Sequence, residues 1–295
     1  MTTNSLKPRG IIASVEIAVY VLTTLFVFIS KTRYRIEFRK QGGWVYLILF
    51  LVLRITSCVL VIVLELTSNP TIGLVVAQVT LTAIALTPLL SAAIGFLKSA
   101  AKFGTGQDLP RFFVYALRLS KLALLAAIVI GIIAGSDLAN GAESVSSANN
   151  GRYLTKVSAL ILLGVFVSIC VYTAWFLSHG NSLGHFRTIV IGVGLSLPFF
   201  LVRIIYSILS AFTLSGSGYF SGGVANKFNT INGSWPIYLV MAVLSQFFIT
   251  VILFIAGVAM QKDIPQRYQN EQDLENASKE SAPDSSFSFL LRRLR

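Results

Sequence analysis

Residues 44–67 read WVYLILFLVLRITSCVLVIVLELT, a largely apolar run that contains two charged residues, Arg54 and Glu65. A helix needs about 20 mostly apolar residues to cross the hydrocarbon core of a bilayer. The run is long enough and apolar enough, so it predicts a membrane-spanning helix.

Six further stretches have the same character, and together they predict an all-α membrane protein with seven spans. The predicted spans are 11–30, 44–67, 71–97, 112–135, 157–177, 187–212 and 235–260. Residues 1–10 form a short segment before the first span, and we expect the polar tail 261–295 to be mostly disordered. The connections 136–156 and 213–234 are rich in Gly, Ser and Asn and are predicted to be loops.

The overall composition supports a membrane protein and excludes several other classes. The 295 residues are 55% hydrophobic and 12% charged, with a mean hydropathy of +0.75. Soluble domains carry about 25% charged residues. Two cysteines, Cys58 and Cys170, imply no disulfide framework, and two histidines are too few for a membrane di-iron site. We therefore expect no metal, no cofactor and no nucleic-acid partner, despite the net charge of +12.

The lysines and arginines predict how the chain is oriented, because cytoplasmic loops are enriched in both. Seventeen of the 24 fall on the side that holds the 31–43 and 98–121 segments and the tail, and five fall on the opposite side. This places the N-terminus outside or in a lumen, the C-terminus in the cytosol, and the chain in the plasma membrane or an endomembrane. Asn232, in the sequon Asn-Gly-Ser, is then a candidate for glycosylation.

Four charged residues, Glu16, Arg54, Glu65 and Arg203, fall within the predicted spans. Each charge costs about 2.5–3.5 kcal/mol to insert at the centre of a bilayer, so each requires a reason. Helix rise puts Glu16 and Arg203 at similar depths, and we predict that they pair. Arg54 then needs another acceptor, for which Gln78, Gln246, a backbone carbonyl or water are candidates.

Three interpretations of these polar residues remain open. They form a buried network that fixes helix packing, or they line a polar cavity in which the arginines bind an anion or a polar headgroup. The third interpretation is an intramembrane enzyme in which Glu16 and Glu65 supply acid–base catalysis, as in membrane terpene cyclases. Pro88 and Pro198 are expected to bend their spans and free backbone carbonyls, which occurs where transporters bind their substrates.

Several of these stretches resemble a family of uncharacterised fungal seven-span membrane proteins, catalogued as a domain of unknown function. The most specific is Pro198-Phe-Phe-Leu-Val-Arg-Ile-Ile-Tyr-Ser207, and the others include Glu16-Ile-Ala-Val-Tyr20 and Thr87-Pro-Leu-Leu-Ser-Ala-Ala-Ile-Gly95. The resemblance covers most of residues 11–260. It implies the fold and a fungal origin, and it implies no activity. From the residues, the first expectation is non-enzymatic binding of a small amphipathic or anionic molecule, in sensing or transport. The alternatives are the acid–base enzyme and a structural or accessory membrane protein.

Overall fold

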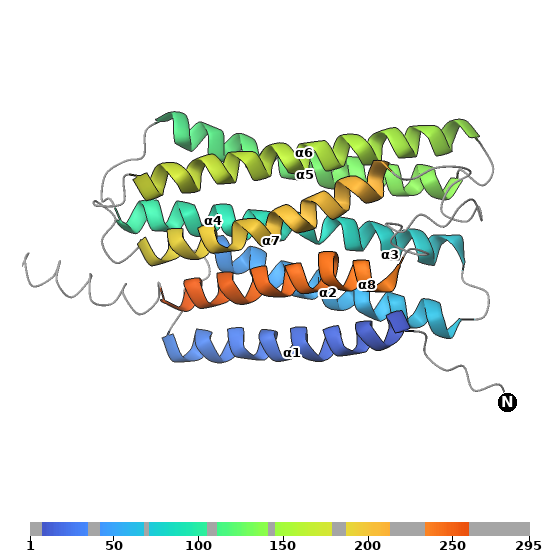
Figure 1. Cartoon of the computed structure of the whole chain (residues 1–295), viewed down its shortest axis with the longest axis horizontal. Coiled ribbons are helices and arrows are strands. Elements are labelled where there is room, and N and C mark those ends of the chain that lie inside the picture. The colour runs from blue at the N-terminus through green and yellow to red at the C-terminus, as the bar shows by residue number, and fades with distance from the viewer. Residues whose placement is uncertain are drawn as a thin grey trace, which may run out of the picture.

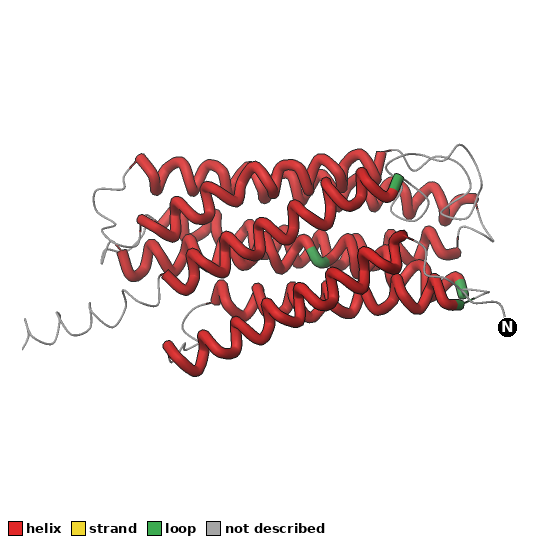
Figure 2. Tube along the Cα trace, turned by 60° about the horizontal axis from the view of Figure 1, so that its bottom comes forward, coloured by secondary structure: helices red, strands yellow, loops and turns green. Residues whose placement is uncertain are grey.

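The computed structural model is an all-helical bundle whose helices run along one common axis (Figure 1). The structure describes residues 8–34, 42–67, 71–104, 111–140, 145–178, 187–212 and 234–259. Within these ranges it has no strand, as Figure 2 shows. The segments 1–10 and 261–295, the 213–234 connection and Asn232 fall wholly or mostly outside the described residues.

The described chain contains seven helices that are long and apolar enough to cross a membrane. The first two are α1 (Pro8–Tyr34) and α2 (Gly42–Leu66), and the third span consists of α3 (Ile72–Ile84) and α4 (Leu86–Gly104). Helices α5 (Arg111–Asn140), α6 (Val145–Ser178) and α7 (Arg187–Phe212) follow. The last span begins with α8 (Trp235–Tyr238), passes through a π-helical segment (Leu239–Leu244) and ends at Ala259.

Two of these helices correct the predicted 136–156 loop. Helix α5 extends to Asn140, and α6 already begins at Val145. The composition suggested a loop, but tertiary packing outweighs a weak helix propensity. A side chain at Gly151 would meet Leu138 and the carbonyl of Ala134 at 2.8–3.0 Å, so this glycine lets the two helices touch closely.

The third span is interrupted at Ala85, three residues before Pro88. Proline has no N–H group, so the carbonyl of Ile84 loses the partner that a continuous helix would give it. The hydroxyl of Thr87 donates to that carbonyl instead, at 2.6 Å. The break is therefore internally satisfied. Helix α7 continues past Pro198 without interruption.

Helix α1 lies at one edge of the bundle and packs against α2, while α5 and α6 pack together at the other edge (Figure 1). Helix α2 also packs against α3 and α4, and α7 packs against α4 and α6. Helix α4 is the most enclosed element, because every described side chain from Leu89 to Leu97 is buried.

Close packing at one end of the bundle depends on glycines next to aromatic rings. The rings of Trp44 and Phe96 meet edge to face, with their centroids 5.8 Å apart. A Cβ at Gly43 would lie 2.8 Å from Phe96, and a Cβ at Gly95 would lie 2.6 Å from the backbone nitrogen of Gly43. Helices α2 and α4 therefore touch backbone to backbone, as small residues allow in membrane proteins.

We expect Gly95→Ala to destabilise the protein by about 1–3 kcal/mol, because its methyl group meets backbone that has no room to move. Thermal unfolding of the purified protein in detergent measures the change. The matched control is Gly164→Ala, where a new Cβ meets nothing within 4 Å. Equal melting temperatures for the two variants would contradict the close α2–α4 contact.

Candidate functional site

A buried ion pair joins the first two helices. Nη2 of Arg54 lies 2.8 Å from Oε2 and 3.0 Å from Oε1 of Glu16. Arg54 has no exposed surface, and Glu16 is 5% exposed. Charges this deep are stable only with a close partner and further hydrogen bonds, since the apolar surroundings solvate neither ion.

Two further side chains complete this pair. The thiol of Cys58, one turn after Arg54 on α2, donates to Oε2 of Glu16 at 2.9 Å. The phenol oxygen of Tyr238, on α8, accepts from Nη2 of Arg54 at 3.3 Å. The ion pair therefore connects α1, α2 and the last span.

The structure corrects our expectation that Glu16 pairs with Arg203. Depth can be counted along each helix from the end of the bundle that holds Pro8, where α2 and α7 end at Leu66 and Phe212. On this count Glu16 lies about 12 Å deep, Arg203 about 14 Å and Arg54 about 18 Å. All three are within reach of one another in depth, so depth does not select the partner. The order of the helices does, because α1 packs against α2, whereas α7 packs against α4 and α6. Arg54 consequently needs neither Gln78 nor Gln246 as its acceptor.

Arg203 is 2% exposed and uses neutral acceptors. Its Nη1 donates to the hydroxyl of Ser207 at 2.8 Å, and its Nη2 donates to the carbonyl of Thr82 at 3.4 Å. That carbonyl belongs to the last turn of α3, where helix carbonyls have no partner within the helix. The break at Ala85 thus presents an acceptor to Arg203.

Thr82 is also the centre of a second set of hydrogen bonds. Its hydroxyl lies 2.8 Å from the hydroxyl of Ser57 and accepts from Nε2 of Gln78 at 3.3 Å. Thr82 therefore links Gln78 to Arg203. Gln246 is buried too, but neither atom of its amide has a partner among the described residues.

Glu65 lies apart from Glu16, one residue before the end of α2. Its electrostatic neighbour is Arg9, whose guanidinium carbon lies 5.8 Å from the centre of the Tyr238 ring. No hydrogen bond or ion pair joins Glu16 to Glu65 in the described part of the chain. The geometry therefore makes Glu16 the counter-ion of Arg54.

The polar cluster, as we call it from here on, comprises the ion pair with its two completing side chains, Arg203 with its acceptors, the two side chains that bond to the hydroxyl of Thr82, and the surrounding tyrosines. Its members are Glu16, Tyr20, Arg54, Ser57, Cys58, Gln78, Thr82, Arg203, Tyr206, Ser207 and Tyr238. The hydroxyl groups of Tyr20 and Tyr206 and the Nε groups of both arginines are buried donors without a partner among the described residues. The cluster therefore has more hydrogen-bond donors than the described chain satisfies.

Sequence reasoning found the charged members of this cluster and Gln78, but it missed the tyrosines, the two serines, Cys58 and Thr82. Gln246, the other predicted glutamine, is not part of the cluster. Tyr206 is within the Pro198–Ser207 motif, and Tyr238 follows Trp235 where aromatic residues often mark the membrane interface. These two carried a weak signal. Thr82 carried none, because its importance arises from the helix break.

Comparison with known protein families gives a match over most of the chain. A family model described as a domain of unknown function (DUF7702) matches residues 6–263, which include every described helix. No curated protein and no solved structure matches the chain.

We expect Glu16→Gln to cost about 3–5 kcal/mol of stability, because it leaves Arg54 buried without a counter-charge. Unfolding of the purified protein in bicelles measures the loss. The double variant Glu16→Gln with Arg54→Gln should recover part of it, since no unpaired charge remains. Strictly additive effects of the two substitutions would contradict a direct pair.

Proposed function

The chain belongs to the DUF7702 family, and we propose that its membrane bundle binds the anionic group of a small amphipathic molecule, as a sensor or carrier. One observation carries the proposal. The buried Arg203 has no carboxylate partner in the described chain, because Glu16 is used by Arg54. A buried positive charge without a counter-ion is costly, so residues of this kind usually have a functional role in membrane proteins.

The charges around Arg203 favour an anion as the ligand. Arg9, Arg54 and Arg203 lie around Tyr206 and Tyr238, and their positive charges exceed the negative charges of Glu16 and Glu65 by one. The positive charge of Arg54 also acts unfavourably on Arg203. A carboxylate or phosphate group near Arg203 would relieve this repulsion.

The unsatisfied hydrogen-bond donors support the same ligand chemistry. The Nε groups of Arg54 and Arg203 and the hydroxyls of Tyr20 and Tyr206 can all donate to an oxygen. Hydrogen bonds between charged donors and an anion are about twice as strong as neutral ones. An acceptor-rich group is therefore the complement of this cluster.

Arg9 adds positive charge near the end of the bundle, where such a group would approach. It lies two residues into the first span, half-buried, over the ring of Tyr238. The hydroxyl of the same tyrosine contacts Arg54. Positive charge thus continues from the end of the bundle to its interior, which would attract an anion inward.

We expect decanoate to stabilise the protein against thermal unfolding in uncharged phosphatidylcholine nanodiscs, and decanol to do so much less. At ten times the dissociation constant the gain is about 1.4 kcal/mol. Adding phosphatidylglycerol to the bilayer tests whether a lipid headgroup supplies the anion instead of a free amphiphile.

Arg203→Gln should abolish the stabilisation by the anionic amphiphile. Arg118→Gln, which changes an exposed arginine on α5, should leave it intact. Stabilisation by decanol equal to that by decanoate, or an unchanged decanoate effect in Arg203→Gln, would refute the proposal.

We also propose that the end of the bundle near Pro8 faces the outside or a lumen, and that the chain ends in the cytosol. The support is the excess of lysine and arginine on the opposite side. The polar cluster then lies in the outer half of the membrane, because Glu16 and Arg203 are both closer to the Pro8 end of their helices.

Protease added to the cytosolic face of sealed vesicles should remove an epitope tag placed after Arg295 and leave a tag placed before Met1 intact. Detergent-opened vesicles, in which both tags are cleaved, are the control. Protection of the C-terminal tag in sealed vesicles would reverse the proposed orientation.

A further inference from the structure

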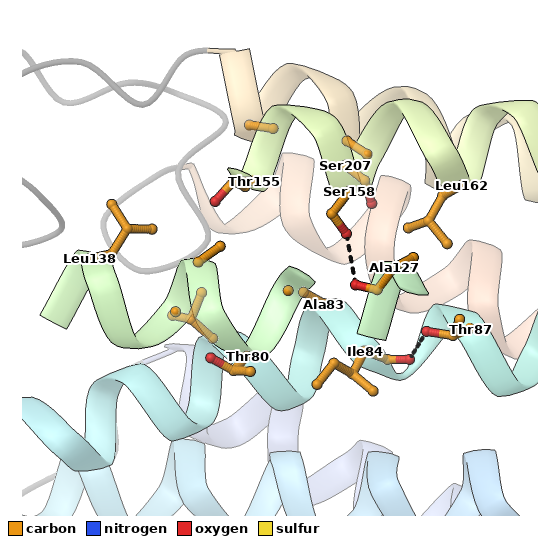
Figure 3. Close-up of a pocket in the computed structure, with 16 residues that line it drawn as sticks. Thr80, Ala83, Ile84, Thr87, Ala127, Leu138, Thr155, Ser158, Leu162 and Ser207 are labelled. Carbon is orange, nitrogen blue, oxygen red and sulfur yellow. Dashed lines mark hydrogen bonds between the residues drawn. The ribbon is translucent and has the colours of Figure 1, made fainter. Parts of the chain in front are cut away.

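A cavity of about 80 Å³ lies between the α3–α4 break and helices α5, α6 and α7 (Figure 3). Ala127, Gly131, Gly135 and Ala159 form much of its wall, and small side chains of this kind leave space. A Cβ added at Gly131 would meet only the hydroxyl of Ser158, at 3.8 Å. Among the described residues, no charged side chain lines the cavity.

Most of the hydroxyl groups around the cavity have already used their protons. Thr87 donates to the carbonyl of Ile84, and Ser158 donates across to the carbonyl of Ala127 at 3.1 Å, as Figure 3 marks. Thr155 and Ser207 likewise donate to carbonyls of their own helices. These hydroxyl groups can therefore act only as hydrogen-bond acceptors toward a molecule in the cavity. Both lone pairs of the Ser158 oxygen remain available for this.

The remaining hydroxyl, on Thr80, makes no hydrogen bond with the described residues and is free to donate. The cavity thus offers several acceptors and one neutral donor. A carboxylate would find too few donors here. A cation would be repelled by Arg203, which donates a hydrogen bond to the cavity-lining Ser207. A neutral hydroxyl group, which both donates and accepts, fits this set.

The size of the cavity limits how large the ligand that carries this hydroxyl group can be. It is about half as large as an apolar cavity of about 150 Å³ that holds benzene. Few atoms beyond a hydroxyl group and a short alkyl chain can enter.

We propose that this cavity is a binding site for a short-chain alcohol of about two to four carbons, whose hydroxyl group donates to Oγ of Ser158 and whose alkyl chain lies against Ala127, Gly131 and Leu162. The site is distinct from the anion site proposed above. The two are connected through Ser207, which lines the cavity and accepts from Arg203.

The test uses 3-fluoropropan-1-ol as the probe, with ¹⁹F relaxation measured on the full-length protein in phosphatidylcholine nanodiscs. Empty nanodiscs give the contribution of lipid partitioning. We expect protein-dependent broadening that 1-propanol removes by competition and that propionate and propylammonium do not. No broadening beyond empty nanodiscs, or equal competition by propionate, would overturn the proposal.

Two matched pairs of variants locate the site. Gly131→Val should weaken binding at least about tenfold by filling the space, while Gly164→Val, on an open face of α6, should not. Ser158→Ala should weaken binding about fivefold through the lost hydrogen bond. Ser168→Ala, whose hydroxyl bonds only to the carbonyl of Gly164 on an exposed face, should not.

Thermal unfolding of each variant separates loss of the site from loss of the fold. A folded Gly131→Val protein that binds the probe as tightly as the unsubstituted chain would refute the assignment. Decanoate stabilisation is measured on the same samples and should be kept in Gly131→Val, because the anion site does not use the cavity.

Discussion

The hydrocarbon core of a membrane cannot solvate charge, so Glu16 and Arg54 must satisfy each other inside the protein. Their contact fixes how α1 lies on α2, since an ion pair at 2.8 Å tolerates little sliding of one helix along the other. The pair also forms hydrogen bonds with Cys58 and Tyr238, and the bond to Tyr238 connects the last span to the first two. Most importantly, it engages Glu16, the one buried carboxylate among the described residues. Arg203 is left without a carboxylate partner among the described residues, and the proposed affinity for an anion follows from this choice of partner.

The break in the third span is the second feature on which the site depends. A continuous helix would have engaged the carbonyl of Thr82 in its own backbone ladder. The break leaves that carbonyl for Arg203, and Ala83, Ile84 and Thr87 beside the same break line the cavity. One irregularity thereby contributes to both proposed sites. Broken helices at binding sites are common in membrane transporters for the same reason, since freed backbone groups are useful ligands.

The two ends of the bundle differ in character. Near Trp44 and Phe96, Gly43 and Gly95 bring α2 and α4 into backbone contact. Toward Pro8 the interior is polar, the last span contains a π-helical segment, and buried donors have no partner in the described chain. π-Helical segments occur frequently at functional sites, and this one directly follows Tyr238. The close-packed end holds the helices together, and the polar end contains the groups on which the proposed anion binding depends.

The sequence by itself determined the number of spans, their approximate limits and the identity of the buried charges. Long apolar runs are stable in the hydrocarbon core of a bilayer, and a charged residue within such a run is easily recognised in the sequence. The sequence did not determine the partners of those charges, because Arg54 and Arg203 both lie at depths within reach of Glu16. Only the tertiary structure decided between them, by placing α1 next to α2. It also decided that Gly151 continues a helix and that Thr82 becomes an acceptor, because both depend on neighbouring helices that are distant in sequence.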